Sequence, residues 1–249
     1  MRILAIESSS LVASAAIADF GEDEILRAEY TTNLKKTHSQ TLLPMIDEIM
    51  RTLDAEGDGI DAIAVAAGPG SFTGLRIGAA TVKGLGLVWQ KPVIPVPTVD
   101  AMAYQFYGTE HLICPIMDAR RSQVYTGIYT FKNGTEFETR MPQCAMALAD
   151  LCEELNRLGE RVVFAGDGIP VARNILRDKL TVPYTFAPAH MNRQRAASVA
   201  SLGAVLFREG KTVDADVFAP DYLRVSQAER ERKERAEHGE EHCPAVTVE

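Results

Sequence analysis

The chain reads Gly68-Pro69-Gly70-Ser71-Phe72-Thr73-Gly74-Leu75-Arg76-Ile77-Gly78 between two apolar segments, and this stretch decides the fold. The run before it, 60–67, is short and ends at a turn, which is typical of a buried strand. The segment 73–89 that follows has the length and apolar content of a helix. Glycines at such a junction allow positive φ and the close approach of another backbone or of a phosphate. The stretch therefore predicts a strand, a glycine turn and a helix of an α/β protein.

Candidate phosphate-binding residues lie in this turn and in an earlier serine-rich turn. They are Ser8, Gly68, Gly70, Ser71 and Gly74. The amides at the start of a helix form a generic anion site. However, no Gly-Lys-Ser/Thr follows the turn, and its spacing is not G-x-G-x-x-G. The alternative is that the glycines only permit tight packing of the strand and the helix, and the sequence leaves both interpretations open.

The same order of elements occurs twice along the chain. The first half predicts strands at 2–6, 11–18, 25–30, 60–67 and 93–96 and helices at 38–53 and 73–89. The second half predicts strands at 112–117 and 123–131, a hairpin at Asn133-Gly134, a helix at 146–158, a strand at 161–165, the turn Gly166-Asp167-Gly168 and helices at 171–180 and 197–208. This duplication predicts the α/β, actin-like (ASKHA, ribonuclease H-like) plan, in which two lobes face a cleft.

The predicted division of the chain is an N-terminal lobe at 1–100, a C-terminal lobe at 101–224 and a tail at 225–249. The N-terminal lobe carries the helices that we expect to bind a partner. Glu, Arg, Lys and His dominate the tail, and it has no apolar stripe. We therefore expect it to be disordered or to form an isolated charged helix.

Composition limits the classes of partner. The net charge is −8, from 26 Lys and Arg against 34 Asp and Glu. This sign is wrong for a broad surface that binds a phosphate backbone, so we expect a partner to supply most of the basic surface for any nucleic-acid contact. The four cysteines include no C-x-x-C pair, which is typical of a reducing compartment. The N-terminus meets Glu7 too early for a signal-peptide core, and charges and glycines interrupt the most apolar stretch. We expect a cytoplasmic protein without a membrane span.

The helices predicted at 38–53 and 73–89 are apolar on more than one face. A helix that covers a sheet needs only one buried stripe, so a second stripe predicts a protein–protein interface. The candidate partner-binding residues are His38, Leu42, Leu43, Ile46, Ile49, Met50, Leu75, Gly78, Ala79 and Val82. The alternative is that the two helices merely pack on each other. If the interface forms here, a bulky residue at Gly78 or Ala79 should abolish partner binding and leave the fold largely intact.

No catalytic or metal site can be assembled from the sequence. His38 has no second ligand one turn later, where Thr41 and Leu42 stand, so a capping or interface role is expected. His238 and His242 have helical spacing beside Cys243, but their acidic tail favours a solvated segment. No Ser-His-Asp arrangement or carboxylate pair emerges. We therefore predict no catalytic residues and no metal.

Five motifs, in order from the N-terminus to about residue 224, resemble the TsaB (YeaZ) family. They are Ile3-Leu4-Ala5-Ile6-Glu7-Ser8-Ser9, His38-Ser39-Gln40-Thr41-Leu42-Leu43-Pro44, the stretch 68–78, Asp118-Ala119-Arg120-Arg121-Ser122-Gln123-Val124-Tyr125 and Pro220-Asp221-Tyr222-Leu223-Arg224. The resemblance implies an actin-like fold whose two N-lobe helices pair with those of a related catalytic subunit, TsaD. With TsaD and the ATPase TsaE, the family serves in the transfer of a threonylcarbamoyl group from threonylcarbamoyl-adenylate to N6 of adenosine 37 of tRNA.

Two departures favour a non-catalytic subunit. The catalytic relative holds its metal with H-x-x-x-H, and here Leu42 replaces the second histidine after His38. The family's usual Asp-Thr-Ser opening is here Glu7-Ser8-Ser9, whose longer acid would intrude into a phosphate site. The resemblance thus implies a TsaD-like partner, a TsaE-like P-loop ATPase, a homodimer when the chain is alone, and ATP or ADP only at the complex interface. The alternative is a free-standing actin-like ATPase or small-molecule kinase that uses the Glu7 turn and the 68–74 loop.

Overall fold

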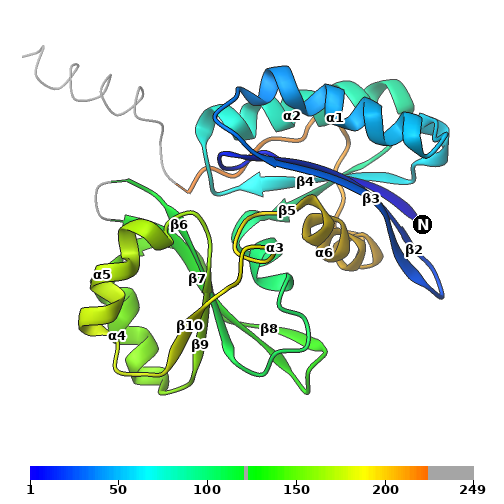
Figure 1. Cartoon of the computed structure of the whole chain (residues 1–249). Coiled ribbons are helices and arrows are strands. Elements are labelled where there is room, and N and C mark those ends of the chain that lie inside the picture. The colour runs from blue at the N-terminus through cyan, green and yellow to red at the C-terminus, as the bar shows by residue number, and fades with distance from the viewer. Residues whose placement is uncertain (121–122, 224–249) are drawn as a thin grey trace, which may run out of the picture.

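The computed structural model describes residues 1–120 and 123–223. Arg121, Ser122 and Arg224, and with them the expectation for the tail at 225–249, lie outside the described residues. The chain forms two lobes, each built on a five-stranded mixed sheet (Figure 1).

The sheet of the first lobe has the order β3-β2-β1-β4-β5. Its strands are β1 (Arg2–Glu7), β2 (Val12–Phe20), β3 (Glu24–Asn33), β4 (Ala62–Gly68) and β5 (Val93–Pro97). The β1–β2 and β2–β3 pairs are antiparallel, whereas β1–β4 and β4–β5 are parallel. Helices α1 (His38–Thr52) and α2 (Phe72–Trp89) lie together on one face of this sheet, and a short 3-10 helix, η1 (Gly57–Gly59), precedes β4 (Figure 1).

The sheet of the second lobe repeats this plan with the order β10-β9-β6-β7-β8. Its strands are β6 (Leu112–Asp118), β7 (Gln123–Lys132), β8 (Glu136–Ala147), β9 (Val162–Ala165) and β10 (Tyr184–Phe186), and its helices are α4 (Leu148–Leu158) and α5 (Ile169–Lys179). Numbered from its own first strand, each sheet has the order 3-2-1-4-5 with the same parallel and antiparallel pairs. The predicted duplication and the actin-like fold are confirmed.

Burial on both faces explains why β1 is a continuous apolar run. Leu4 and Ile6 pack beneath α1 and α2, while Ile3 and Ala5 pack against α6 (Ala196–Arg208) on the opposite face. A strand that is covered on both sides cannot alternate apolar with polar residues. All four side chains are fully buried.

The end of the described chain returns to the first lobe. Helix α6 packs on β1, β2 and β5, although the sequence division had placed everything from 101 to 224 in the second lobe. Val213 then pairs with Val93, and the Asp221 N–H donates to the Ala67 carbonyl. The apolar period of α6 predicted a helix, but a period does not say which sheet the helix covers. The short α3 (Thr98–Tyr104), which was not predicted, links the lobes.

Among the described helices, none combines the length and the apolar character that a bilayer span requires.

Candidate functional site

The glycine turn of the first lobe interlocks with the β1–β2 turn. A Cβ at Gly70 would overlap the Ser9 carbonyl, and a Cβ at Gly74 would overlap the Ser8 carbonyl. The Ser71 N–H donates to the Ser9 carbonyl over 2.6 Å, and the Ser8 hydroxyl donates to the Gly74 carbonyl over 3.0 Å. These glycines are therefore required for the close approach of two backbones.

The five candidate phosphate-binding residues thus lie together, but the backbone of the β1–β2 turn already occupies the space beside the glycine turn. Ser71 is the N-cap of α2, because its hydroxyl accepts from the Gly74 N–H. An anion at the start of α2 would compete with the Ser9 carbonyl for the Ser71 N–H. The contacts favour the interpretation that the glycines permit tight packing, and phosphate binding by Ser8, Gly68, Gly70, Ser71 and Gly74 stays a prediction.

Glu7 is buried beside this junction, with only 1% of its surface exposed. Its Oε1 accepts a hydrogen bond from the Ser9 N–H over 2.6 Å. Burial raises the pKa of Glu7 to about 7, and the charge of Asp167 adds to the rise. Glu7 therefore holds a proton through much of the range in which an exposed glutamate is charged.

Asp167 belongs to the glycine turn of the second lobe, so the two lobes meet in a buried polar cluster. Burial also raises the pKa of Asp167. Ser9 Oγ, Asp167 Oδ1 and both amide atoms of Gln194 are buried without a hydrogen-bond partner. Among the described residues, no group of three or more His, Cys, Asp and Glu side chains is placed to hold a metal ion. Burial raises the pKa of both carboxyl groups of the cluster, Glu7 and Asp167, so both favour the protonated form more than an exposed acid does.

His38, the first residue of α1, reaches the same β1–β2 turn. Its Nε2 lies 2.7 Å from the Ser10 carbonyl oxygen, and only 8% of the residue is exposed. Its ring also borders Gly74. His38 therefore connects the start of α1 to the β1–β2 turn inside the protein. Contact between His38 and a partner stays a prediction.

Most of the candidate partner-binding side chains are in the chain's own core. Leu42, Ile46, Ile49, Leu75, Gly78, Ala79 and Val82 are buried. A Cβ at Gly78 would overlap the Ser8 hydroxyl, and Ala79 is 7% exposed. A bulky residue at either position would therefore damage the fold, contrary to our expectation from the sequence. Of the candidate set, Leu43 is 52% exposed and Met50 is half-buried.

A different set of residues forms the outer surface of the two helices. We define the outer face of α1 and α2 as Leu43, Ala80, Gly84, Leu87 and Val88, all of them exposed. A Cβ at Gly84 would meet nothing within 4 Å. Sequence reasoning missed all but Leu43, although the spacing of Ala80, Gly84 and Val88 by four residues is a signal for one helix face.

The segment after α6 closes over the start of α2. A Cβ at Gly68 would overlap the Asp221 carbonyl. The Tyr222 ring packs on Phe72 with centroids 4.9 Å apart, and Arg76 Nε donates to the Tyr222 hydroxyl over 3.3 Å. The motif at 220–224 thus acts, in its described part, as a strap across the glycine turn.

Comparisons with known proteins agree with this architecture. Residues 26–232 match the family model described as TsaD, tRNA N6-adenosine threonylcarbamoyltransferase. The chain is 35% identical over 229 residues to the tRNA threonylcarbamoyladenosine biosynthesis protein TsaB of Bacillus subtilis, covering 92% of this chain and 96% of that protein. It is 28% identical to TsaB of Escherichia coli over 92% of this chain and 96% of that protein.

A solved structure gives the same result in three dimensions. YeaZ from Pseudomonas aeruginosa superposes with a TM-score of 0.73 at 25% identity, over 89% of this chain and 99% of that one. The fold, the glycine junction and the extent of these matches together show that the chain belongs to the TsaB (YeaZ) family of tRNA threonylcarbamoyladenosine biosynthesis proteins.

Proposed function

We propose that this chain is a non-catalytic scaffold subunit for threonylcarbamoyl transfer to N6 of adenosine 37 in tRNA. It binds a TsaD-like catalytic homologue through the outer face of α1 and α2, and the pair recruits a TsaE-like P-loop ATPase. Alone, the chain forms a homodimer through the same face. tRNA is contacted through the complex, and ATP or ADP binds only where the subunits meet.

The observation that carries the proposal is the outer face itself. Leu43, Leu87 and Val88 are 52, 59 and 78% exposed, and the small residues Ala80 and Gly84 are exposed on the same helix as Leu87 and Val88. Small residues let another helix approach closely, and exposed large aliphatic residues supply apolar area for the contact. A surface of this kind suits a pair of helices from a structural relative.

The filled junction argues against the alternative of a free-standing ATPase or small-molecule kinase. A kinase of this fold would need open amides at the start of α2, but the Ser9 carbonyl occupies the Ser71 N–H. It would also need a charged acid near the phosphates, whereas burial raises the pKa of Glu7 to about 7. Both observations favour a scaffold.

The test combines a genetic and a biochemical measurement. In cells depleted of this protein, mass spectrometry of digested tRNA should show loss of threonylcarbamoyladenosine, and the wild-type chain should restore it. The purified chain should capture the TsaD-like protein of its own organism and should not hydrolyse ATP by itself. Unchanged levels of threonylcarbamoyladenosine after depletion would overturn the proposal. So would ATP hydrolysis by the chain alone, if the chain also captures no homologue.

A further inference from the structure

A cavity of about 470 Å³ opens between the two lobes. Its lining comes from β5, α3, β8, α6 and the residues after α6, and includes none of the residues of the two glycine turns. The cavity is therefore distinct from the junction around Ser8 and Gly74. Its volume falls within the range of small-molecule sites, about 300–1,000 Å³.

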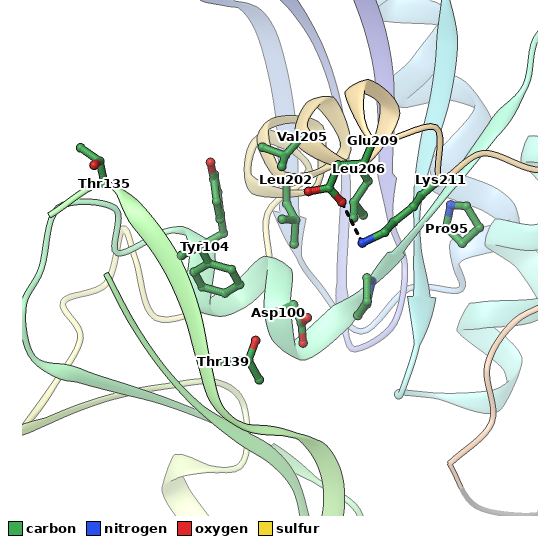
Figure 2. Close-up of a pocket in the computed structure, with 12 residues that line it drawn as sticks. Pro95, Asp100, Tyr104, Thr135, Thr139, Leu202, Val205, Leu206, Glu209 and Lys211 are labelled. Carbon is green, nitrogen blue, oxygen red and sulfur yellow. Dashed lines mark ion pairs between the residues drawn. The ribbon is translucent and has the colours of Figure 1, made fainter. Parts of the chain in front are cut away.

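The walls of this interlobe cavity combine apolar and polar side chains. Leu202, Val205 and Leu206 form the side that belongs to α6, as Figure 2 shows. On the opposite side, Phe137 and Thr139 alternate along β8, so their side chains share one face of that strand, and Thr135 lies in the turn that precedes it. Such walls suit an aliphatic or aromatic body.

Asp100 contributes a carboxyl group to the lining. Asp100 Oδ1 accepts a hydrogen bond from the Tyr129 hydroxyl over 2.6 Å, which fixes the orientation of the carboxyl. Figure 2 shows the oxygen-bearing ends of Asp100 and Thr139 turned toward one another. Burial raises the pKa of Asp100, because the charged form lacks solvent. A cation bound at this carboxyl would stabilise the charged form.

Of the charged residues in the lining, Asp100 alone has no oppositely charged partner within the lining. Glu209 and Lys211 pair with each other, with Oε2 and Nζ 2.7 Å apart (Figure 2). The remaining charged residue of the lining is Asp100. Ionisation of Asp100 would give the cavity a net negative charge, which favours a cationic ligand and disfavours a carboxylate.

We propose that this interlobe cavity binds a small organic amine, whose ammonium group contacts the Asp100 carboxylate and the Thr139 hydroxyl while its apolar body packs on Leu202, Leu206 and Phe137. The proposal is independent of the scaffold function, because it uses none of the outer-face residues.

The test uses three probes of similar size on the full chain: phenethylamine, the neutral 2-phenylethanol and the anionic 3-phenylpropionate. Binding is followed by NMR of methyl-labelled Leu and Val. We expect phenethylamine to bind about 10-fold more tightly than the alcohol, since a charge-assisted hydrogen bond is the distinguishing contact, and we expect shifts at Leu202, Val205 and Leu206. The anion should bind more weakly than the alcohol.

Asp100→Asn is the decisive variant, because an amide oxygen still accepts from the Tyr129 hydroxyl. It should reduce the amine's affinity about 10-fold and leave that of the alcohol unchanged. Asp150→Asn, at an exposed aspartate on α4, is the matched control and should change neither. The proposal is contradicted by equal affinity for amine and alcohol, by tighter binding of the carboxylate, by unchanged amine binding in Asp100→Asn, or by no methyl shifts up to saturating probe.

Discussion

The two lobes carry equivalent pairs of helices, but the outer surfaces of these pairs differ. Both α1 with α2 and α4 with α5 cover one face of a sheet whose strands have the same order. The exposed residues of α4 are Asp150, Glu153 and Arg157, and α5 exposes Arg173, Arg177, Asp178 and Lys179 among others. The residues that define the outer face of α1 and α2 are instead small or apolar, although α1 also exposes Asp47 and Arg51. The same arrangement of helices thus exposes mainly charged side chains in one lobe and a group of small and aliphatic residues in the other.

The two glycine turns make the complementary point. Gly68 and Gly166 both have positive φ, 124° and 114°, and a Cβ at Gly166 would overlap the Ile116 carbonyl much as one at Gly68 would overlap that of Asp221. Close backbone packing therefore accounts for glycine in both lobes. The glycine turns are thus common to both lobes, whereas the exposed surfaces of the helices differ between them.

The largest effect is expected where a glycine of α2 meets the β1–β2 turn. Gly74→Ala places a Cβ against the Ser8 carbonyl, so the free energy of unfolding should fall by about 3 kcal/mol, the upper part of the usual range for overpacking. Gly84→Ala, in the same helix but facing open space, should instead gain about 1 kcal/mol from helix propensity. Urea denaturation of the three chains measures both. Equal stability of Gly74→Ala and wild type would refute the interlocked junction.

The next effect is a dependence of stability on pH, which should differ between Glu7 at the end of β1 and Asp118 at the end of β6. The pKa of Glu7 is raised from an ordinary 4.5 to about 7, so the folded state holds a proton that the unfolded state has lost between these values. Stability should therefore fall as the pH rises from about 4.5 to about 7, by about 3 kcal/mol at most, since one pKa unit corresponds to about 1.4 kcal/mol.

Glu7→Gln should remove this dependence. It should be the more stable chain at pH 8, by up to about 3 kcal/mol, and close to wild type at pH 4. Asp118→Asn, at the half-buried equivalent in the second lobe, should shift stability by less than about 1 kcal/mol, because its partner Arg120 is exposed. Parallel denaturation curves of Glu7→Gln and wild type at pH 4 and pH 8 would show that Glu7 is charged in the folded protein.

A smaller effect on stability is expected from the N-cap of α2, which α5 lacks. Ser71→Ala should cost about 1 kcal/mol, because the Gly74 N–H loses its side-chain acceptor, while Ser71→Asp should retain the cap. Helix α5 follows Gly168 and has no side-chain cap to lose. Thermal denaturation of the two variants checks this, and equal losses in both would show that the hydroxyl does not act as a cap.

Most elements were predictable because their apolar periods are strong. The strands from β1 to β7 and helices α1 and α2 lie within a few residues of their predicted bounds. The partner of the Asn133-Gly134 hairpin, β8, was not delimited because its residues are only partly buried and do not alternate clearly. The three-residue β10 and the seven-residue α3 are too short to show a period.

The site was harder to predict than the fold, because two apolar stripes on one helix look alike in a sequence. In α1, Leu42, Met45, Ile46 and Ile49 face the core and Leu43 faces outward. In α2 the predicted contact residues Leu75, Gly78, Ala79 and Val82 are buried, whereas the exposed positions include Ala80 and Gly84. Only the position of the sheet beneath each helix resolves which stripe is inside.

The central claim is that the outer face of α1 and α2 binds the TsaD-like homologue. The most direct test is the affinity of Gly84→Leu for that protein, measured by calorimetry beside Asn174→Leu on the exposed surface of α5. Gly84→Leu should fold at least as stably as wild type, because its side chain enters open space and leucine favours the helix. We predict that it loses about 100-fold in affinity, as for a residue at the centre of an interface, while Asn174→Leu stays within about 2-fold. Wild-type affinity in Gly84→Leu would contradict the claim.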